Sequence, residues 1–183
     1  MRIALEGIDG AGKTTIARIL SDRLNIKYLK FPRYDFIPII KKHISGEIRL
    51  DDRTTTLLFL ADIIDGINNE NNYIADRLFF STIAYSKLNL DMLVELILEL
   101  SIPFPEYTIY LDIDLDTAFK RISKKYDITE YDRDIDLLNS VKKRYERVFS
   151  HKEILDRTEV IRIDARLSIE EILELIQSRI SKS

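Results

Sequence analysis

Near its N-terminus the chain reads Gly7-Ile8-Asp9-Gly10-Ala11-Gly12-Lys13-Thr14-Thr15, directly behind the mainly apolar stretch Arg2-Ile3-Ala4-Leu5-Glu6. This run fits the phosphate-binding pattern G-x-x-x-x-G-K-[ST] at every fixed position. Glycines let the backbone curl until successive N–H groups point inward, and the helix expected to follow adds its positive N-terminal end. The pattern therefore predicts a strand, a phosphate-binding loop and a helix, with a nucleoside triphosphate such as ATP as the ligand.

Two side chains of this run have specific expected roles. Lys13 is placed to reach the outer phosphates as a point charge, and the Thr14 hydroxyl is placed to bind the accompanying Mg²⁺ ion. Further contacts with the triphosphate are expected from Gly7, Asp9, Gly10, Ala11, Gly12 and Thr15. A glycine-rich turn with a surface lysine is the alternative, but both flanking signals that the motif demands are present.

Length and composition narrow the class of protein. The 183 residues suit one domain spanning 1–183, and no Pro/Gly-rich linker divides them. A formal net charge of -3 offers no general attraction to nucleic acid, and the lack of cysteine excludes disulfides and thiolate zinc sites. Because the chain has neither an apolar run of roughly 20 residues nor a signal-peptide pattern after Met1, we expect a soluble cytoplasmic protein without membrane partners.

Short runs of β-branched and aromatic residues alternate with helical patterns along the chain. Strands are predicted at 3–5, 28–31, 73–75, 108–113 and 160–163, and helices at 16–24, 57–64, 92–100, 137–149 and 169–180. Leu57, Leu58, Ala61 and Ile64 define the expected apolar face of the second helix, and Ser168 with Glu171 forms a capping box before the last. The alternation predicts an α/β fold of the phosphate-loop type, with a five-stranded parallel sheet between helices.

A basic segment at about 120–134 interrupts this alternation. It contains five basic residues and little core periodicity, which predicts a short mobile lid over the phosphates. Closure of such a lid excludes water, which competes as an acceptor of the transferred phosphoryl group. The alternative is a solvated helix end and loop, as most charge runs are.

The chain carries the phosphate loop but neither the N-K-x-D sequence of switch GTPases nor the L-S-G-G-Q signature of transporter ATPases. A small-molecule kinase remains, and it needs cations for a second phosphate group. Arg33 follows the second predicted strand and Arg77 follows Asp76 at the end of the third. Both positions lie at the carboxyl edge of the sheet, where the loop lies and where α/β proteins bind ligands.

These segments together resemble the thymidylate kinase family of nucleoside monophosphate kinases over nearly the whole chain. The resembling segments are the loop with Asp9, Phe31-Pro32-Arg33, Leu57-Leu58-Phe59-Leu60-Ala61-Asp62, Asp76-Arg77 with Ser81 and Ala84-Tyr85, Tyr110-Leu111-Asp112-Ile113, and Lys120-Arg121 with Asp132-Arg133. The resemblance implies transfer of the γ-phosphoryl group of ATP to dTMP, Mg²⁺ as cofactor, small-molecule nucleotides as partners, and a homodimer.

The resemblance also implies roles for single residues. Asp9 would contact the acceptor sugar, and Arg33, in the segment that begins with Phe31, would contact the acceptor 5′-phosphate. Phe59 would stack on the base, Asp76 would lie near Mg²⁺, Arg77 would hold phosphate and Tyr85 would pack beside the base. From spacing alone, Phe59 and Tyr85 also suit an apolar core, and Asp76 with Arg77 also suits an exposed ion pair.

Two kinds of departure from the family pattern affect the expected chemistry. Ile63 stands where the family commonly has an arginine that reads the base, so relaxed base preference is expected. Leu78 follows Asp76-Arg77 where a tyrosine is common. Gly10 and Ala11 place no arginine in the loop, so Arg121 and Lys125 of the lid are expected to supply the catalytic cation.

Two other functions remain open at this point. A kinase for a nucleoside or another neutral alcohol would not need a second phosphate clamp such as Arg33, and a regulatory module would bind nucleotides without turnover. His43 and His151 have no partner at ligand spacing and are expected to be structural or surface residues. Asp112, Asp114 and Asp116 lack the rest of a calcium loop and predict a strand end with a helix cap.

Overall fold

The computed structural model describes residues 1–124 and 134–181. Its centre is a parallel sheet with the strand order β2-β3-β1-β4-β5. The strands are β1 (Arg2–Glu6), β2 (Lys27–Lys30), β3 (Tyr73–Asp76), β4 (Tyr107–Asp112) and β5 (Glu159–Asp164). The predicted α/β fold with a five-stranded parallel sheet is confirmed, and every strand matches its prediction closely.

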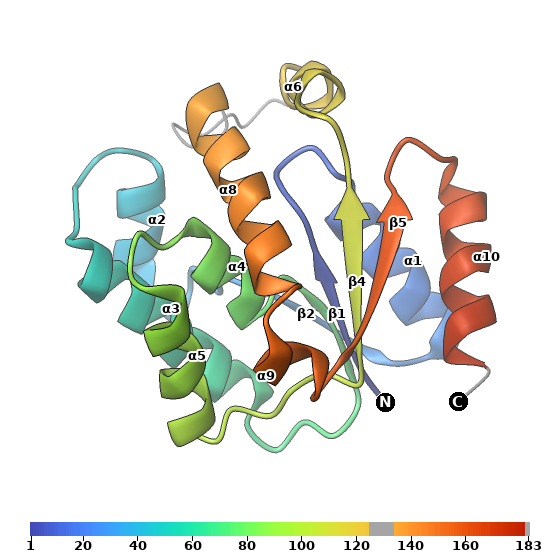
Figure 1. Cartoon of the computed structure of the whole chain (residues 1–183), viewed down its shortest axis with the longest axis horizontal. Coiled ribbons are helices and arrows are strands. Elements are labelled where there is room, and N and C mark those ends of the chain that lie inside the picture. Colours follow the sequence, from blue (N-terminus) through green and yellow to red (C-terminus); the bar gives the residue numbers. More distant parts are fainter. Residues whose placement is uncertain (125–133, 182–183) are drawn as a thin grey trace.

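Helices cover both faces of this sheet (Figure 1). They are α1 (Lys13–Leu24), α2 (Pro38–Ile44), α3 (Asp52–Ile67), α4 (Phe79–Tyr85), α5 (Leu90–Glu99), α6 (Leu115–Ile122), α8 (Ile135–Val148), α9 (Lys152–Leu155) and α10 (Ile169–Ile180). In Figure 1, α1 and α10 lie on one side of the sheet and α3, α4, α5 and α8 on the other. The carboxyl ends of the strands therefore lie between two layers of helices, and the loop after β1 begins at this edge of the sheet.

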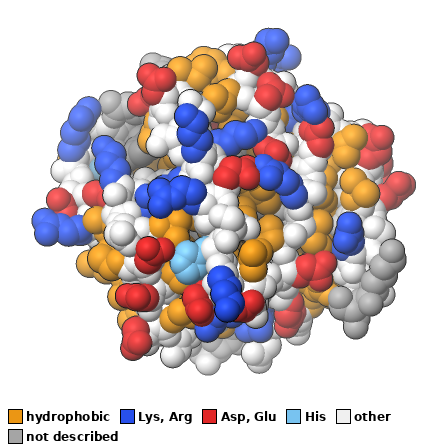
Figure 2. Space-filling view, viewed as in Figure 1, with side chains coloured by type: hydrophobic (Ala, Val, Ile, Leu, Met, Phe, Trp, Pro, Cys, Tyr) orange, Lys and Arg blue, Asp and Glu red, His pale blue; other side chains and the backbone are white. Residues whose placement is uncertain are grey.

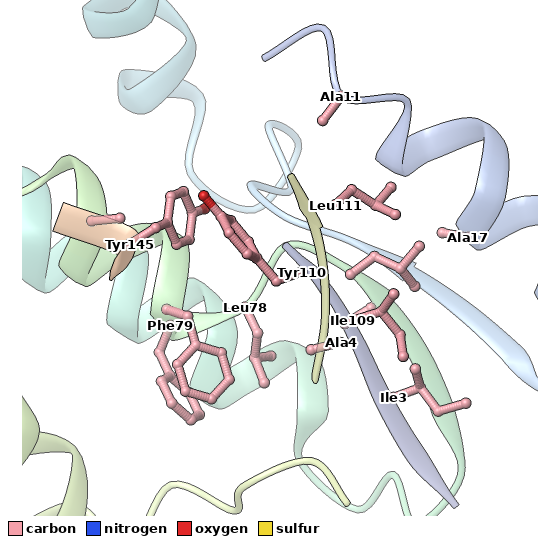
Figure 3. Close-up of a cluster of buried hydrophobic side chains, with 14 of the residues drawn as sticks. Ile3, Ala4, Ala11, Ala17, Leu78, Phe79, Ile109, Tyr110, Leu111 and Tyr145 are labelled. Carbon is pink, nitrogen blue, oxygen red and sulfur yellow. The ribbon is translucent and has the colours of Figure 1, made fainter. Parts of the chain in front are cut away.

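The core is the central part of the sheet, where the strands are buried on both faces. In Figure 3, Ile109 and Leu111 of β4 point toward Ala17 of α1, whereas Tyr110 points the other way, toward Tyr145 of α8. All five are buried. Strands with two buried faces form nearly continuous apolar runs, and this explains why the sequence located them well.

The second predicted helix forms as α3 but buries a different face from the one expected. Leu57 is 54% and Ile64 39% exposed, while Thr56 and Ile63 are buried. The apolar residues of α3 itself are distributed around most of the helix, so their spacing does not determine which face packs against the sheet. Its inward face carries polar groups because, as described below, that face lines a cavity.

The structure also bears on the predicted helix caps, the short helices and the lid. The capping box of Ser168 and Glu171 is confirmed at α10, and the Asp114 side chain caps α6 by accepting from the N–H of Thr117. The short helices α2, α4 and α9 were not predicted, since each has too few turns for a periodic pattern, and α6 was indicated only by its cap. The predicted lid at about 120–134 falls mainly on 125–133, outside the described residues.

Both signs of charge are spread over the face seen in Figure 2, with apolar side chains between them. Among the described residues, none of the helices combines the length and apolar character needed to cross a membrane.

Candidate active site

The loop between β1 and α1 has the backbone of a phosphate cradle. Gly10 and Gly12 adopt positive φ angles of 84° and 91°, which side chains rarely tolerate. Gly12 is the N-cap of α1 and provides no side-chain cap, so the helix N-terminus is not covered from within. A Cβ atom added to Gly12 would meet nothing within 4 Å, so open space lies above this point of the loop. The geometry suits an anion bound by backbone N–H groups.

Lys13 lies in the first turn of α1 and curls back over the loop. Its side chain is buried, and Nζ donates a hydrogen bond to the carbonyl oxygen of Ile8 at 2.8 Å. Burial, and then the positive charge of Arg77, lower the pKa of Lys13 to about 8. The ammonium group is thus held beside the loop in surroundings that a polyphosphate would complement.

Thr14 and Asp76 meet where the phosphate loop approaches the end of β3. Thr14 Oγ1 donates to Asp76 Oδ2 at 2.5 Å, and the Tyr28 hydroxyl donates to the same oxygen at 3.1 Å. Adjacent hydroxyl and carboxylate oxygens are ligands that Mg²⁺ prefers, especially when phosphate oxygens complete the shell. Residues 1–124 and 134–181 contain no group of three or more histidine, aspartate or glutamate side chains that could hold a metal. The pair fits an ion shared with a bound triphosphate.

Asp9, Arg77 and Tyr85 form a second charged group directly beside the loop. Arg77 Nη2 donates to Asp9 Oδ1 at 2.7 Å, the Tyr85 hydroxyl donates to Asp9 Oδ2 at 2.7 Å, and the Arg77 guanidinium lies over the Tyr85 ring. Burial opposes the charge on Arg77, but Asp9, Tyr85, Tyr145 and Glu6 together raise the pKa of Arg77 well above its usual value. Burial and the Asp9 charge raise the pKa of Tyr85 as well, so this hydroxyl remains a donor.

A cavity of about 770 Å³ opens beside this charged group. It brings together five predicted substrate contacts: Asp9, Phe31, Phe59, Arg77 and Tyr85. Sequence reasoning missed several other lining residues, among them Tyr34, His43, Arg49, Asp52, Thr56, Thr82, Ser86 and Lys87. None of these belongs to a motif, so the only available signal was their closeness along the chain to Arg33, Phe59 or Tyr85.

His43 also has a structural task, in agreement with the expectation for it. Its Nδ1 accepts a hydrogen bond from the backbone N–H of Leu50 at 3.2 Å. This bond ties α2 to the segment before α3, so the wall of the cavity formed by these elements is held together.

Arg33 has a different environment from the other predicted site residues. Its Nε donates to Asp62 Oδ1 at 2.8 Å, its Nη2 donates to Asp65 Oδ2 at 2.7 Å, and its guanidinium stacks on Phe36. Among the described residues that line the cavity, Phe31, Pro32 and Tyr34 appear and Arg33 does not. The arginine therefore fastens its segment to α3, and its neighbours form the cavity wall.

Of the last two predicted cations, Arg121 lies in the last turn of α6. Arg121 Nη1 approaches the carbonyl oxygen of Gly10 at 3.5 Å, which places this guanidinium beside the phosphate loop. Of the remaining loop residues, Ala11 is buried and Thr15 lies in the first turn of α1. Lys125 lies outside the described residues.

Comparison with known proteins adds to this geometry. The family model for thymidylate kinase matches residues 5–176. A probable thymidylate kinase from Sulfolobus acidocaldarius is 36% identical over 94% of this chain and 92% of the relative. One from Archaeoglobus fulgidus is 33% identical over 97% and 93%.

Solved structures agree on the fold. Thymidylate kinase from Candida albicans superposes with a TM-score of 0.79 at 24% identity, covering 98% of this chain and 90% of the other. Deoxyadenosine kinase from M. mycoides also superposes with a TM-score of 0.79, at 20% identity and covering 100% and 99%. At these identities the two likenesses show the fold alone.

Proposed function

This chain belongs to the thymidylate kinase family of nucleoside monophosphate kinases, and we propose that it transfers the γ-phosphoryl group of ATP to dTMP, giving ADP and dTDP. One observation supports the proposal above all. Arg77 and Asp9 line the acceptor cavity and also adjoin the phosphate loop, since Arg77 Nη1 lies 3.4 Å from the carbonyl oxygen of Gly7. Donor and acceptor sites thus share one wall, which in-line transfer between two bound nucleotides requires.

In this proposal the triphosphate of ATP lies on the loop, against the backbone N–H groups and Lys13. Thr14 and Asp76 would hold Mg²⁺, which neutralises charge on the phosphate oxygens. Lys13 and Arg121 approach the loop from opposite parts of the chain, one from α1 and one from α6. Together they offset the negative charge that spreads over the transferring group.

The acceptor fills the adjoining cavity. Its phosphate faces Arg77, its sugar lies by Asp9 and Tyr85, and its base lies against Phe59. An acceptor phosphate oxygen then bonds to the γ-phosphorus while the bond from this phosphorus to the bridging oxygen of ADP breaks. Arg77 carries one of the fixed positive charges between the two phosphate groups, so it favours their close approach.

The guanidinium of Arg33, from which an acceptor-phosphate contact is expected, is held against Asp62 and Asp65 in the structure. We assign that contact to Arg77 and give Arg33 a positioning role. Its bonds to α3 hold Phe31 and Pro32 against the cavity, and Phe31 is buried there.

Base preference is proposed to be relaxed, and Ile63 is the reason. Ile63 lines the cavity one helical turn after Phe59, so it faces a base stacked on that ring. An aliphatic side chain offers no hydrogen bond to a carbonyl of thymine. Binding of the base therefore lacks, at this position, a hydrogen bond from a charged donor, which is worth about 1.5–3 kcal/mol.

Two further proposals concern partners and place. The exposed Leu57 and Ile64 lie on the outward face of α3, where they suit the contact surface of a homodimer. ATP and nucleoside monophosphates are its proposed small-molecule partners, and because they are cytoplasmic metabolites we place the enzyme in the cytoplasm.

The test is an assay of ADP release with ATP and a panel of acceptors that contains dTMP, dUMP, dCMP, dAMP and thymidine. Lys13→Ala should abolish turnover, while Lys152→Ala, an exposed lysine of α9, should leave it unchanged. Turnover with thymidine but not with the monophosphates would indicate a nucleoside kinase. Nucleotide binding without ADP release from any acceptor would indicate a regulatory module.

A further inference from the structure

Among the described residues, the mechanism above leaves the buried carboxylate of Glu6 without a role. Glu6 is the last residue of β1, directly before the phosphate loop, and it is 0% exposed. Burial raises its pKa, but its two oxygens still accept three hydrogen bonds. Oε1 accepts from the N–H of Leu78 at 2.7 Å, and Oε2 accepts from the hydroxyls of Ser81 at 2.5 Å and Tyr145 at 2.8 Å. So many partners are needed where a carboxylate is withdrawn from water.

Two hydrogen bonds to the end of β1, one of them to Glu6, hold the backbone around Arg77. The φ angle of Arg77 is 73°, in the left-handed region that a non-glycine residue seldom adopts. The N–H of Arg77 donates to the carbonyl oxygen of Leu5 at 3.0 Å, and the next N–H, of Leu78, donates to Glu6. The last two residues of β1 therefore fasten the chain on both sides of the unusual angle.

The third element of the arrangement is Ser81, which links the carboxylate to the guanidinium. An ionised carboxylate only accepts, so the Ser81 hydroxyl donates to Glu6 and turns its lone pairs elsewhere. Arg77 Nη1 donates to this same Ser81 oxygen at 3.1 Å. Glu6 thereby fixes the direction of the serine hydroxyl and makes it an acceptor for one side of the guanidinium, while Asp9 holds the other side.

We propose that Glu6 is a positioning residue for Arg77: through Ser81 and the Leu78 N–H it holds the guanidinium at the wall shared by the two nucleotide sites. The proposal rests on the proposed function, in which Arg77 meets the acceptor phosphate. It differs from a purely structural role because the effect of Glu6 on the reaction must pass through Arg77.

Glu6→Gln tests this with little change in volume. The amide keeps one acceptor oxygen but adds an N–H₂ donor, which faces either Ser81 and Tyr145 or the Leu78 N–H. If the N–H₂ group faces Leu78, two donors oppose each other. If it faces Ser81 and Tyr145, the Ser81 hydroxyl must turn its hydrogen away from residue 6, and a hydrogen turned toward Arg77 opposes the guanidinium donor. We expect kcat/KM for dTMP to fall about 10- to 100-fold while KM for ATP changes less than about twofold.

The decisive measurement is the double variant Glu6→Gln/Arg77→Ala. If Glu6 acts through Arg77, then Glu6→Gln causes no further loss of kcat/KM for dTMP once Arg77 is alanine. Ser81→Ala, which keeps the buried charge, should lower kcat/KM about 10-fold and should likewise add nothing to Arg77→Ala. Ser81→Ala therefore decides the question even if Glu6→Gln does not fold.

Thr108→Val is the matched control. It removes a buried hydroxyl of β4, bonded to Thr158 at 2.9 Å, and should lower the melting temperature without changing the kinetic constants. The positioning role would be overturned if kcat/KM for dTMP in the double variant fell by the product of the two single losses. Equal increases in KM for ATP and dTMP in Glu6→Gln would overturn it as well. If Arg77→Ala alone leaves kcat/KM for dTMP unchanged, the proposed function of Arg77 is wrong, and the role of Glu6 falls with it.

Discussion

Replacing Ile63 with arginine should convert a weakly selective acceptor site into one that prefers thymine. Ile63 is 2% exposed and lines a cavity of about 770 Å³, which has room for a longer side chain. A guanidinium there could donate to the 4-carbonyl of thymine, whereas cytosine presents an amino donor at the same place. A hydrogen bond from a charged donor is worth about 1.5–3 kcal/mol, so the preference for dTMP over dCMP should rise roughly 10- to 150-fold.

Burying the new charge will also cost stability, and this cost is the reason for measuring a ratio. Desolvation of the guanidinium affects the enzyme with either substrate, so it largely cancels when kcat/KM for dTMP is divided by kcat/KM for dCMP. Ile63→Met is the control, because it lengthens the side chain without adding a donor. The preference for dTMP over dUMP should stay constant, since both bases carry the carbonyl.

Two results would refute the reasoning. The first is a wild-type enzyme that already prefers dTMP over dCMP by about a thousandfold, since another residue would then supply the recognition of up to 3 kcal/mol that Ile63 lacks. The second is an Ile63→Arg variant whose ratio matches that of Ile63→Met.

Three further predictions concern other parts of the chain. Arg121→Ala should lower kcat about 100-fold in the ADP-release assay with little change in melting temperature, and an unchanged kcat would assign the cation to another lid residue. Because the pKa of Lys13 in the free protein is lowered to about 8, ATP should bind more weakly as pH rises above 8. Binding near pH 8 should take up protons, as calorimetry in buffers of different ionisation heat can measure, and uptake that persists in Lys13→Ala would exclude this lysine as the source. Leu57→Glu together with Ile64→Glu should shift sedimentation from dimer to monomer, and an unaltered species would place the interface elsewhere.

The strands of the sheet were predictable because the pattern that marks each strand lies within a short stretch of sequence. Each strand is an apolar run bounded by polar or turn residues, and the phosphate-loop motif identifies the strand and helix beside it. The apolar face of α3 was not predictable, since Leu57 and Ile64 match the core residues in character but lie outside the packed layer. Burial of Thr56 instead depends on the cavity, which forms only when distant segments meet.

The motifs drew attention to residues that the structure brings together around the loop and the cavity, but they give no sign of a partner that lies far along the chain. The segment Phe31-Pro32-Arg33 drew attention to its arginine, but Asp62 and Asp65, which bind it, are about thirty residues away. Glu6 looks like an ordinary strand residue beside a more prominent motif. Its importance depends on contacts with Ser81 and Tyr145, which no spacing in the sequence relates to it.

Helix α6 packs directly on the phosphate loop at Gly10. A Cβ atom on Gly10 would lie 2.6 Å from the carbonyl oxygen of Ala118, so any larger residue at this position would push α6 away. The same close approach brings Arg121, one turn further along α6, to the Gly10 carbonyl. An arginine carried by the loop at Gly10 and a helix packed directly on the loop are therefore alternatives. This chain has the second, so we expect the cation that assists Lys13 to come from α6 or from the residues that follow it.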